Sequence, residues 1–183
     1  GRNASGQGAT LDVAMYDALF SMLTTSHALH LYADKLPQRV GNRHPLSTPF
    51  GCFATQDGQV VIAVLSGKQF TALAALIGAS DAAQDPRFAS DESRTEHEPA
   101  VKALIEGWSK GLTTEQAVAA LAGVGLPAAP IWDIAQAAGS EHARARGLVS
   151  LLGATPVVGQ PVRFDGEKPL AATPAPALGG DRA

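Results

Sequence analysis

The sequence has 183 residues, of which 45% are hydrophobic, 5% aromatic and 17% charged, and its formal net charge is −3. This acidic balance argues against nucleic acid or an anionic membrane as the main partner, and no apolar run approaches the ~18 residues that a membrane helix needs. The single cysteine, Cys52, excludes an internal disulfide framework and fits a reducing compartment.

The composition indicates that this chain packs against further protein. Charged residues fall below the usual share of about a quarter, while small apolar residues are plentiful. That balance predicts more buried surface than one small domain supplies, through either an extensive partner interface or a second half. The sequence starts with Gly1 rather than Met, and the Gly-rich stretch 1–8 is typical of a linker. We therefore expect a piece of a longer chain or a processed product.

The region after this stretch predicts one long helix. Thr10 can cap its first turn, where Asp12 is favourably placed. We expect the helix to end near Asp34, because Pro37 prevents it from continuing. Its apolar face recurs at helical spacing and contains Leu11, Met15, Ala18 and Met22.

Two short apolar runs, residues 50–55 and 60–65, flank the dipeptide Asp57-Gly58. This arrangement is a strong hairpin signal, and it predicts a type I′ turn with positive φ at the two central residues. A polar, turn-rich loop, Gly41–Pro45, precedes the hairpin.

Three helices are predicted after the hairpin. Ser66 can cap the first, and the second starts near Pro99 and carries an apolar stripe at helical spacing. Thr113 and Gln116 match a capping box that opens the third. These helices and the hairpin predict a compact α+β unit.

The remaining stretches are predicted to contain irregular, extended and regular segments, including two short helices that Asp133 and Ser140 can cap. Residues 79–98 are polar and irregular, with Phe88 expected to anchor them on the core. Residues 126–132 are expected to be extended, because they contain two prolines. Residues 148–152 and 157–164 are predicted to be strands.

The loop before the hairpin is the best candidate for ligand binding. Gly41 lets the backbone approach a ligand closely, and Asn42 and His44 can donate hydrogen bonds. Arg39 and Arg43 can pair with phosphate oxygens through a bidentate fork. The alternative is that the loop only shapes a turn and its arginines are solvated. The residues by themselves favour this simpler interpretation.

No catalytic or metal-binding motif is visible elsewhere. The sequence contains no G-x-S-x-G elbow, Walker loop or paired-cysteine zinc site. His27 and His30 lie three apart, but no third ligand stands at a recognisable spacing, so we expect no metal site. Cys52 lies in an apolar run, which favours a small core residue over a nucleophile.

A series of short motifs runs along nearly the whole chain. The motifs are Gly6-Gln7-Gly8, Gly41-Asn42-x-His44-Pro45, Pro49-Phe50-Gly51-x-Phe53-x-Thr55-x-Asp57-Gly58, Asp85-Pro86-Arg87-Phe88 with Arg94, Trp108, Gly125-Leu126-Pro127-Ala128-Ala129-Pro130 and Ala175-Pro176-Ala177-Leu178-Gly179. Together they resemble the C-terminal half of the family III CoA-transferases, the group that includes formyl-CoA transferase, carnitine CoA-transferase and 2-methylacyl-CoA racemase. A minor departure is Leu126, where valine is commoner.

The resemblance implies an α+β fold in three parts. Residues 1–45 would form a linker and the long helix, residues 46–126 a small α+β domain, and residues 127–183 a segment that returns to a large domain outside this chain. Two chains would interlock as a homodimer, and a glycine-containing loop near Gly41–Pro45 would cover the reacting thioester. The nucleophilic aspartate of the family would lie upstream, so no catalytic residue is assigned here.

The resemblance also implies the reaction. The parent protein would move CoA from an acyl-CoA thioester to a carboxylic acid through an aspartyl intermediate, in the cytoplasm and without a tightly bound cofactor. The CoA thioester would be the substrate, and Gly41, Asn42, Arg43, His44 and Arg39 would be candidates for binding it. The alternatives are a 2-methylacyl-CoA racemase of the same fold, whose acid and base would also lie upstream, and a non-catalytic fragment or interaction module.

Overall fold

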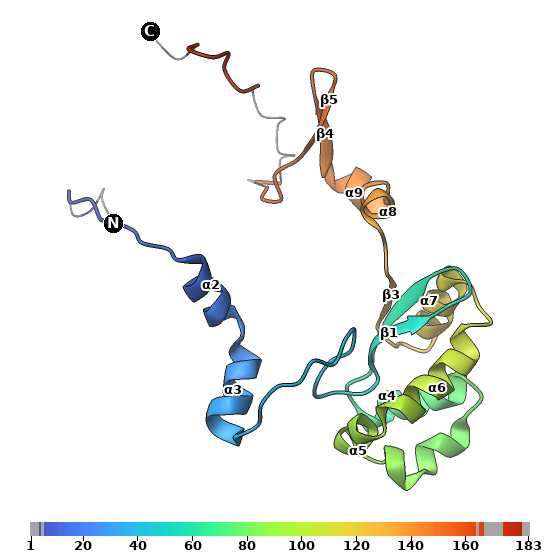
Figure 1. Ribbon diagram of the computed structural model, residues 1–183. Coiled ribbons are helices and arrows are strands. Elements are labelled where there is room, and N and C mark those ends of the chain that lie inside the picture. The colour runs from blue at the N-terminus through green and yellow to red at the C-terminus, as the bar shows by residue number, and fades with distance from the viewer. Residues whose placement is uncertain (1–3, 5, 164, 167–173, 181–183) are drawn as a thin grey trace.

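The computed structural model of the protein describes residues 4, 6–163, 165–166 and 174–180. A central body contains the sheet β1–β3 and the helices α4 to α7 (Figure 1). The helices α2 and α3 lie apart from this body, and the elements from α8 to β5 extend away from it in another direction (Figure 1). This mixture of helices and small antiparallel sheets is the predicted α+β class.

The central sheet is antiparallel in the order β1-β2-β3. It consists of β1, Phe50–Ala54, β2, Gln59–Ala63, and β3, Ala128–Pro130. Alternate residues of β1 and β2 are buried, as expected for a sheet with one face on the core. The predicted hairpin and the predicted extended stretch after residue 126 are therefore confirmed. The pairing of β2 with β3 was not predicted.

Three helices supply half of the core residues. They are α4, Gly67–Leu76, α6, Glu98–Ser109, and α7, Thr114–Gly123. The Ser66 cap and the capping box of Thr113 and Gln116 are both present, as predicted. The core residues are Phe53, Val60, Ile62, Val64, Phe70, Leu73, Phe88, Val101, Ile105, Ala117, Leu121 and Leu126.

The stretch from residue 79 to residue 98 is more regular than predicted. It forms the 3-10 helices η1, Ser80–Gln84, and η2, Pro86–Phe88, and the helix α5, Asp91–Glu96. Local caps explain why these helices form. The Asp85 carboxylate accepts the Arg87 N–H at the start of η2, and Ser90 forms a capping box with Ser93 at the start of α5. The anchoring role of Phe88 is confirmed, since it is 3% exposed.

The hairpin turn differs from the predicted type I′. The last paired residues are Ala54 and Gln59, so the loop has four residues, and neither Asp57 nor Gly58 is among the described residues with positive φ. Asp57 serves another element instead. Its Oδ1 accepts the Thr114 N–H at 2.7 Å and the Thr114 hydroxyl at 2.9 Å, at the first residue of α7.

Replacing Asp57 by alanine is expected to lower the melting temperature, and the size of the effect should depend on pH. The N–H and hydroxyl of Thr114 hold the pKa of the Asp57 carboxyl below its usual value. A carboxyl with a lowered pKa in the folded state stabilises the protein above about pH 4, and this contribution disappears as the pH falls through the lowered pKa. The difference between wild type and Asp57→Ala should therefore shrink between pH 7 and pH 3.

The exposed Asp81 provides the control, because Asp81→Ala should leave the melting temperature nearly unchanged at both pH values. A deficit of Asp57→Ala that stays constant from pH 7 to pH 3 would contradict the electrostatic role of Asp57.

The predicted long helix is divided into two helices. These are α2, Met15–Met22, and α3, Thr24–Ala33, and residues 11–14 are not helical. The break arises at the Phe20 carbonyl, which pairs with the Leu23 N–H at 3.2 Å and with His27 Nε2 at 2.7 Å. These contacts occupy the acceptor that a continuous helix would offer to Thr24. The predicted end near Asp34 is confirmed, because Asp34 adopts a left-handed conformation with φ of 51°.

Two short helices and a second hairpin follow the central body. They are α8, Ile134–Ala138, α9, Glu141–Arg146, β4, Val149–Leu152, and β5, Thr155–Val158. β4 and β5 pair antiparallel, which confirms the two predicted strands, although β5 is shorter than residues 157–164 and starts earlier. Residue 164, where the second strand was expected to end, lies outside the described residues.

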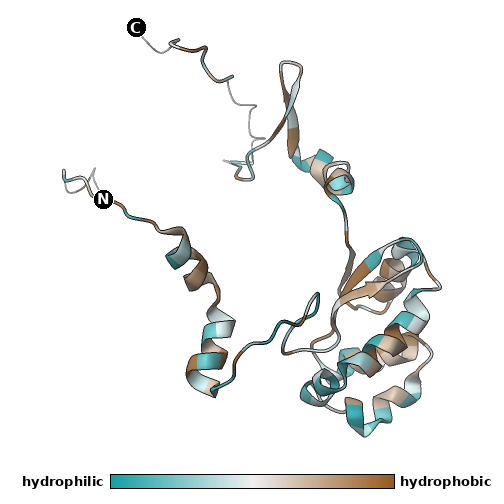
Figure 2. Cartoon of the chain, viewed as in Figure 1, coloured by the Kyte–Doolittle hydropathy of each residue, from teal (hydrophilic) through white to brown (hydrophobic). Residues whose placement is uncertain are grey.

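Apolar side chains remain exposed outside the central body. Figure 2 shows hydrophobic ribbon along α2, away from the sheet. The large apolar residues of this helix that are more than half exposed are Met15, Tyr16, Leu19, Phe20 and Met22. Among the described residues, no helix is both long enough and apolar enough to cross a membrane. The division of the chain at residues 45 and 126 stays a prediction.

Candidate functional site

The loop that the sequence singled out lies along the open edge of β1. The His44 N–H donates to the Phe50 carbonyl at 2.7 Å, and the Cys52 N–H donates to the Asn42 carbonyl at 3.0 Å. Arg43 forms an isolated antiparallel bridge with Gly51 between these two bonds. The segment 42–44 is therefore held along the edge of β1 by one isolated bridge and two backbone hydrogen bonds.

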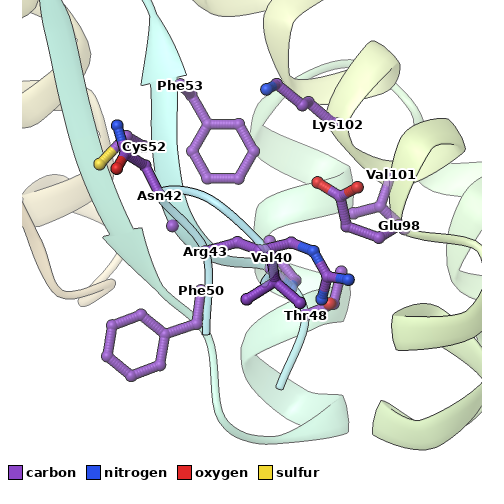
Figure 3. A pocket seen from close by; sticks show the side chains of 12 residues that line it. Val40, Asn42, Arg43, Thr48, Phe50, Cys52, Phe53, Glu98, Val101 and Lys102 are labelled. Atoms are coloured by element: carbon purple, nitrogen blue, oxygen red, sulfur yellow. The ribbon is translucent and has the colours of Figure 1, made fainter. Parts of the chain in front are cut away.

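A pocket of about 140 Å³ lies between this loop, the start of β1 and one side of α6. Figure 3 shows the Arg43 side chain crossing the pocket toward Thr48 and Glu98, with Lys102 on the neighbouring turn of α6. The lining residues are Val40, Asn42, Arg43, Thr48, Pro49, Phe50, Gly51, Cys52, Phe53, Glu98, Val101 and Lys102.

The charged groups of the pocket are two cations and one carboxylate. Arg43 Nη1 donates weakly to the His44 carbonyl at 3.4 Å, which holds its guanidinium near the loop backbone. The Lys102 ammonium lies 4.0 Å from a Glu106 oxygen on the same helix, and Glu98 supplies the carboxylate. The site can therefore offer donors and positive charge to an anionic ligand, together with the amide of Asn42.

The other three candidate residues do not line this pocket. The His44 ring stacks on the Phe50 ring at 5.0 Å with an angle of 6° between their planes, and His44 Nδ1 accepts the Leu46 N–H at 3.2 Å. Gly41 has φ of +69°, so its conformation favours glycine, and Arg39 is exposed. The structure thus brings Asn42 and Arg43 together and separates them from Gly41, His44 and Arg39.

The sequence reasoning missed the contribution of α6. Glu98 and Lys102 stand four residues apart, which places them on one face of a helix. That spacing predicts that Glu98 and Lys102 share a helix face. It does not predict that this face packs beside a loop more than fifty residues earlier in the sequence. Thr48 was also missed.

A second, wider hollow of about 950 Å³ lies where the hairpin turn, the start of α7 and the connection from β3 to α8 meet. Its apolar residues include Val118, Ile131 and Trp132, and its acidic residues include Glu115 and Asp133. The Asp133 carboxylate accepts the Gln136 N–H at 2.7 Å and so caps α8. No feature of the sequence had indicated this hollow.

Among the residues that the structure describes, three carboxyl groups have lowered pKa values, each because a partner donates hydrogen bonds to it. Hydrogen bonds from Thr114, Arg87 and Lys110 lower the pKa of Asp57, Asp85 and Glu106, respectively. A general acid at neutral pH needs a raised pKa, so these groups are suited to holding the structure together. In the part of the chain that the structure describes, no group of three His, Cys, Asp or Glu residues could hold a metal ion.

The sequence profile of "CoA-transferase family III" matches residues 1–182. The chain belongs to CoA-transferase family III. The acetyl-CoA:oxalate CoA-transferase of Acetobacter aceti is 36% identical over 170 residues, which cover 90% of this chain and 42% of that protein. The succinate–glutarate CoA-transferase of Agrobacterium fabrum is 29% identical over 144 residues, 79% of this chain and 36% of that protein.

The fold of this family III chain also matches a solved structure. A CAIB/BAIF family protein from Brucella suis superposes with a TM-score of 0.81 and 30% sequence identity, over 98% of this chain and 47% of that protein. The family and the fold class expected from the motifs are therefore confirmed. The family III chain spans less than half the length of these relatives.

Proposed function

We propose that this chain is the C-terminal portion of an acyl-CoA:carboxylate CoA-transferase. The observation that carries the proposal is the match to CoA-transferase family III over residues 1–182, with relatives named as CoA-transferases of oxalate and of succinate and glutarate. Those names favour transfer over the racemase alternative. The full enzyme would move CoA from an acyl-CoA thioester to a carboxylic acid.

The proposed chemistry needs an aspartate outside this chain. Its carboxylate would attack the thioester carbonyl to give a mixed anhydride and free CoA thiolate, and the thiolate would then attack the aspartyl carbonyl and release the donor acid. The aspartyl-CoA thioester would react with the acceptor carboxylate by the same two steps in reverse order. CoA enters as part of the substrate, so the proposal requires no tightly bound cofactor. A cytoplasmic location stays a prediction.

The pocket beside Arg43 supports a role for this chain in binding the CoA ester. Arg43 of the loop and Lys102 of α6 provide positive charge in the pocket, and Asn42 also lines it. The loop itself is fixed on β1 by the bridge between Arg43 and Gly51. Arginine pairs with phosphate through a bidentate fork, and lysine does so as a point charge. We propose that Asn42 and Arg43 contact the CoA ester, with Gly41, His44 and Arg39 as further candidates on the same loop.

The exposed apolar side chains support the proposed homodimer. Tyr16 is 75% exposed and Met22 is 75% exposed on α2, while Ile134 of α8 is 86% exposed. Large apolar side chains left exposed in such number are typical of surfaces that another protein chain covers. Burial of these side chains against a second chain and the upstream half would complete the protein.

The 183-residue chain alone is expected to show no transferase activity, because the proposed nucleophile lies upstream. The measurement is CoA exchange between two carboxylic acids, followed by mass spectrometry, with the full-length enzyme as the positive control. Turnover by the isolated chain would contradict the proposal that the nucleophile lies upstream of it. Absence of turnover in the full-length enzyme with every acid tested would contradict the proposed function.

In the full-length enzyme, Arg43→Ala is expected to raise KM for the acyl-CoA about tenfold with little change in melting temperature. The loop would keep its place, because the Arg43 bridge to β1 involves the backbone. Arg87→Ala is a matched control, since Arg87 is an exposed arginine paired with Asp85 at 2.7 Å and does not line the pocket. An unchanged KM for Arg43→Ala would exclude this ligand role.

A further inference from the structure

Arg94 of α5 is a buried cation whose side chain points at backbone groups of other segments. It is 1% exposed. Its Nε donates to the Thr48 carbonyl at 2.7 Å, its Nη1 to the Phe88 carbonyl at 3.0 Å and its Nη2 to Asp91 Oδ1 at 3.3 Å. The guanidinium also lies 4.8 Å from the centre of the Phe70 ring. Each branch of the guanidinium thus has its own acceptor, an arrangement that lysine could not reproduce.

Thr48 is held by α5 through all of its polar groups. Its N–H donates to Asp91 Oδ1 at 3.1 Å, its carbonyl accepts from Arg94, and its hydroxyl lies 3.2 Å from the hydroxyl of Thr95. Thr48 is 2% exposed, so these bonds are shielded from water. We call Asp91, Arg94 and Thr95 the α5 clamp.

The clamp acts at the point where the chain passes from the candidate loop into β1. Pro49, the next residue, accepts the Val64 N–H at 2.9 Å. Phe50 and Cys52 then provide the carbonyl and N–H to which the loop is hydrogen-bonded. Thr48 itself lines the pocket beside Arg43 (Figure 3). The position of the loop therefore depends on the start of β1, and the start of β1 depends on α5.

We infer that the α5 clamp fixes the position of the candidate loop, Gly41–Pro45, for binding of the acyl-CoA. Arg94 and Thr95 are then positioning residues of the transferase. The inference rests on the proposed function. Neither side chain lines the pocket. Their removal should loosen the segment 42–52 and weaken binding of the acyl-CoA, while the chemistry of the bound substrate changes little.

The test compares variants of the full-length enzyme by two measurements, which are amide hydrogen exchange in residues 42–52 and steady-state kinetics. Thr95→Val removes the hydroxyl that faces Thr48 and keeps the side-chain shape. Thr71→Val is its matched control, because both hydroxyls donate to the carbonyl four residues earlier, Thr95 at 2.9 Å and Thr71 at 3.1 Å, and Thr71 belongs to the exposed side of α4. Arg94→Met removes the three hydrogen-bond donors of the guanidinium.

Thr95→Val is expected to raise KM for the acyl-CoA about fivefold, and Arg94→Met roughly tenfold or more, with kcat changed by no more than about twofold. Exchange at the amides of His44 and Cys52 should become faster in both variants and stay unchanged in Thr71→Val. Arg94→Lys should behave like Arg94→Met, because one ammonium cannot reach three acceptors. If Arg94→Met does not fold, Thr95→Val decides the question alone.

If amide exchange in residues 42–52 is unchanged in folded Thr95→Val and Arg94→Met, the α5 clamp does not fix this segment and the inference is overturned. Faster exchange with an unchanged KM would overturn its role in acyl-CoA binding. A wild-type enzyme without acyl-CoA turnover would contradict the proposed function instead, and the exchange measurement would still decide whether α5 fixes the loop.

Discussion

Replacing Phe88 with alanine is expected to lower the free energy of unfolding by about 3–5 kcal/mol. Phe88 is 3% exposed, and its ring meets the Phe70 ring edge to face at 6.0 Å. The substitution would remove both the buried apolar area and this aromatic pair, and it would leave a cavity where η2 joins the core. Urea unfolding followed by circular dichroism gives the change in free energy.

Leu65→Ala serves as the control for Phe88→Ala, because Leu65 is 62% exposed and should cost less than about 1 kcal/mol. The comparison separates the effect of burial from that of losing any large apolar side chain. A loss for Phe88→Ala no greater than that for Leu65→Ala would contradict the assignment of Phe88 to the core. It would also remove the explanation for why residues 79–98 follow a fixed course.

Phe88 belongs to the features that could be predicted from the sequence, because its large apolar side chain lies within a polar stretch. The Ser66 cap and the capping box of Thr113 and Gln116 were predictable for a related reason, since their bonds span three residues. Hairpin pairing was equally local. For the caps and the hairpin, the sequence pattern and the interaction that it predicts lie within a few positions of each other.

The features that were not predicted depend on partners far away in the sequence or on a side chain that competes with the backbone. Asp57 is a favourable turn residue, but Thr114, 57 positions later, takes its carboxylate, and the turn type changes. His27 binds the Phe20 carbonyl and interrupts a helix whose apolar spacing is continuous. Neither effect is visible in hydrophobic periodicity, which records burial and not hydrogen-bond competition.

The candidate site was half predictable for the same reasons. Residue type indicated that Asn42 and Arg43 could bind an anion, and the structure places both at the pocket. Residue type could not show that His44 stacks on Phe50, nor that Glu98 and Lys102 of α6 complete the lining. Those facts follow from how α6 packs on β1, which only the assembled sheet and helices determine.

Gly51→Ala is expected to separate the candidate loop from β1. A Cβ at residue 51 would lie 2.9 Å from the Asn42 carbonyl oxygen and 3.1 Å from Arg43 Cα. Both are backbone atoms, so the clash cannot be relieved by a change of rotamer. The segment 42–44 would move away, and its two hydrogen bonds to β1 would weaken, at a cost of about 1–3 kcal/mol in the free energy of unfolding.

The larger effect of Gly51→Ala should appear in binding. Since the proposed CoA contacts depend on the loop being held at the pocket, KM for the acyl-CoA should rise roughly tenfold or more in the full-length enzyme. Amide exchange at His44 and Cys52 should become faster, as in the Arg94 variants, although the α5 clamp is intact. Gly51→Ala and the Arg94 variants thus disturb the same loop in two different ways. Gly51→Ala acts where the loop contacts β1, and the Arg94 variants act where α5 holds Thr48.

Gly107→Ala is the matched control, because a Cβ at residue 107 meets nothing within 4 Å and the residue lies within α6. It should stabilise the protein by about 0.5–1 kcal/mol and leave KM unchanged. If Gly51→Ala instead keeps wild-type exchange at His44 and a wild-type KM, the close approach of the loop to β1 does not govern binding. The pocket beside Arg43 would then not be the binding site of the CoA ester. The wider hollow at Trp132 would be the remaining candidate, to be tested by amide exchange and by KM for the acyl-CoA.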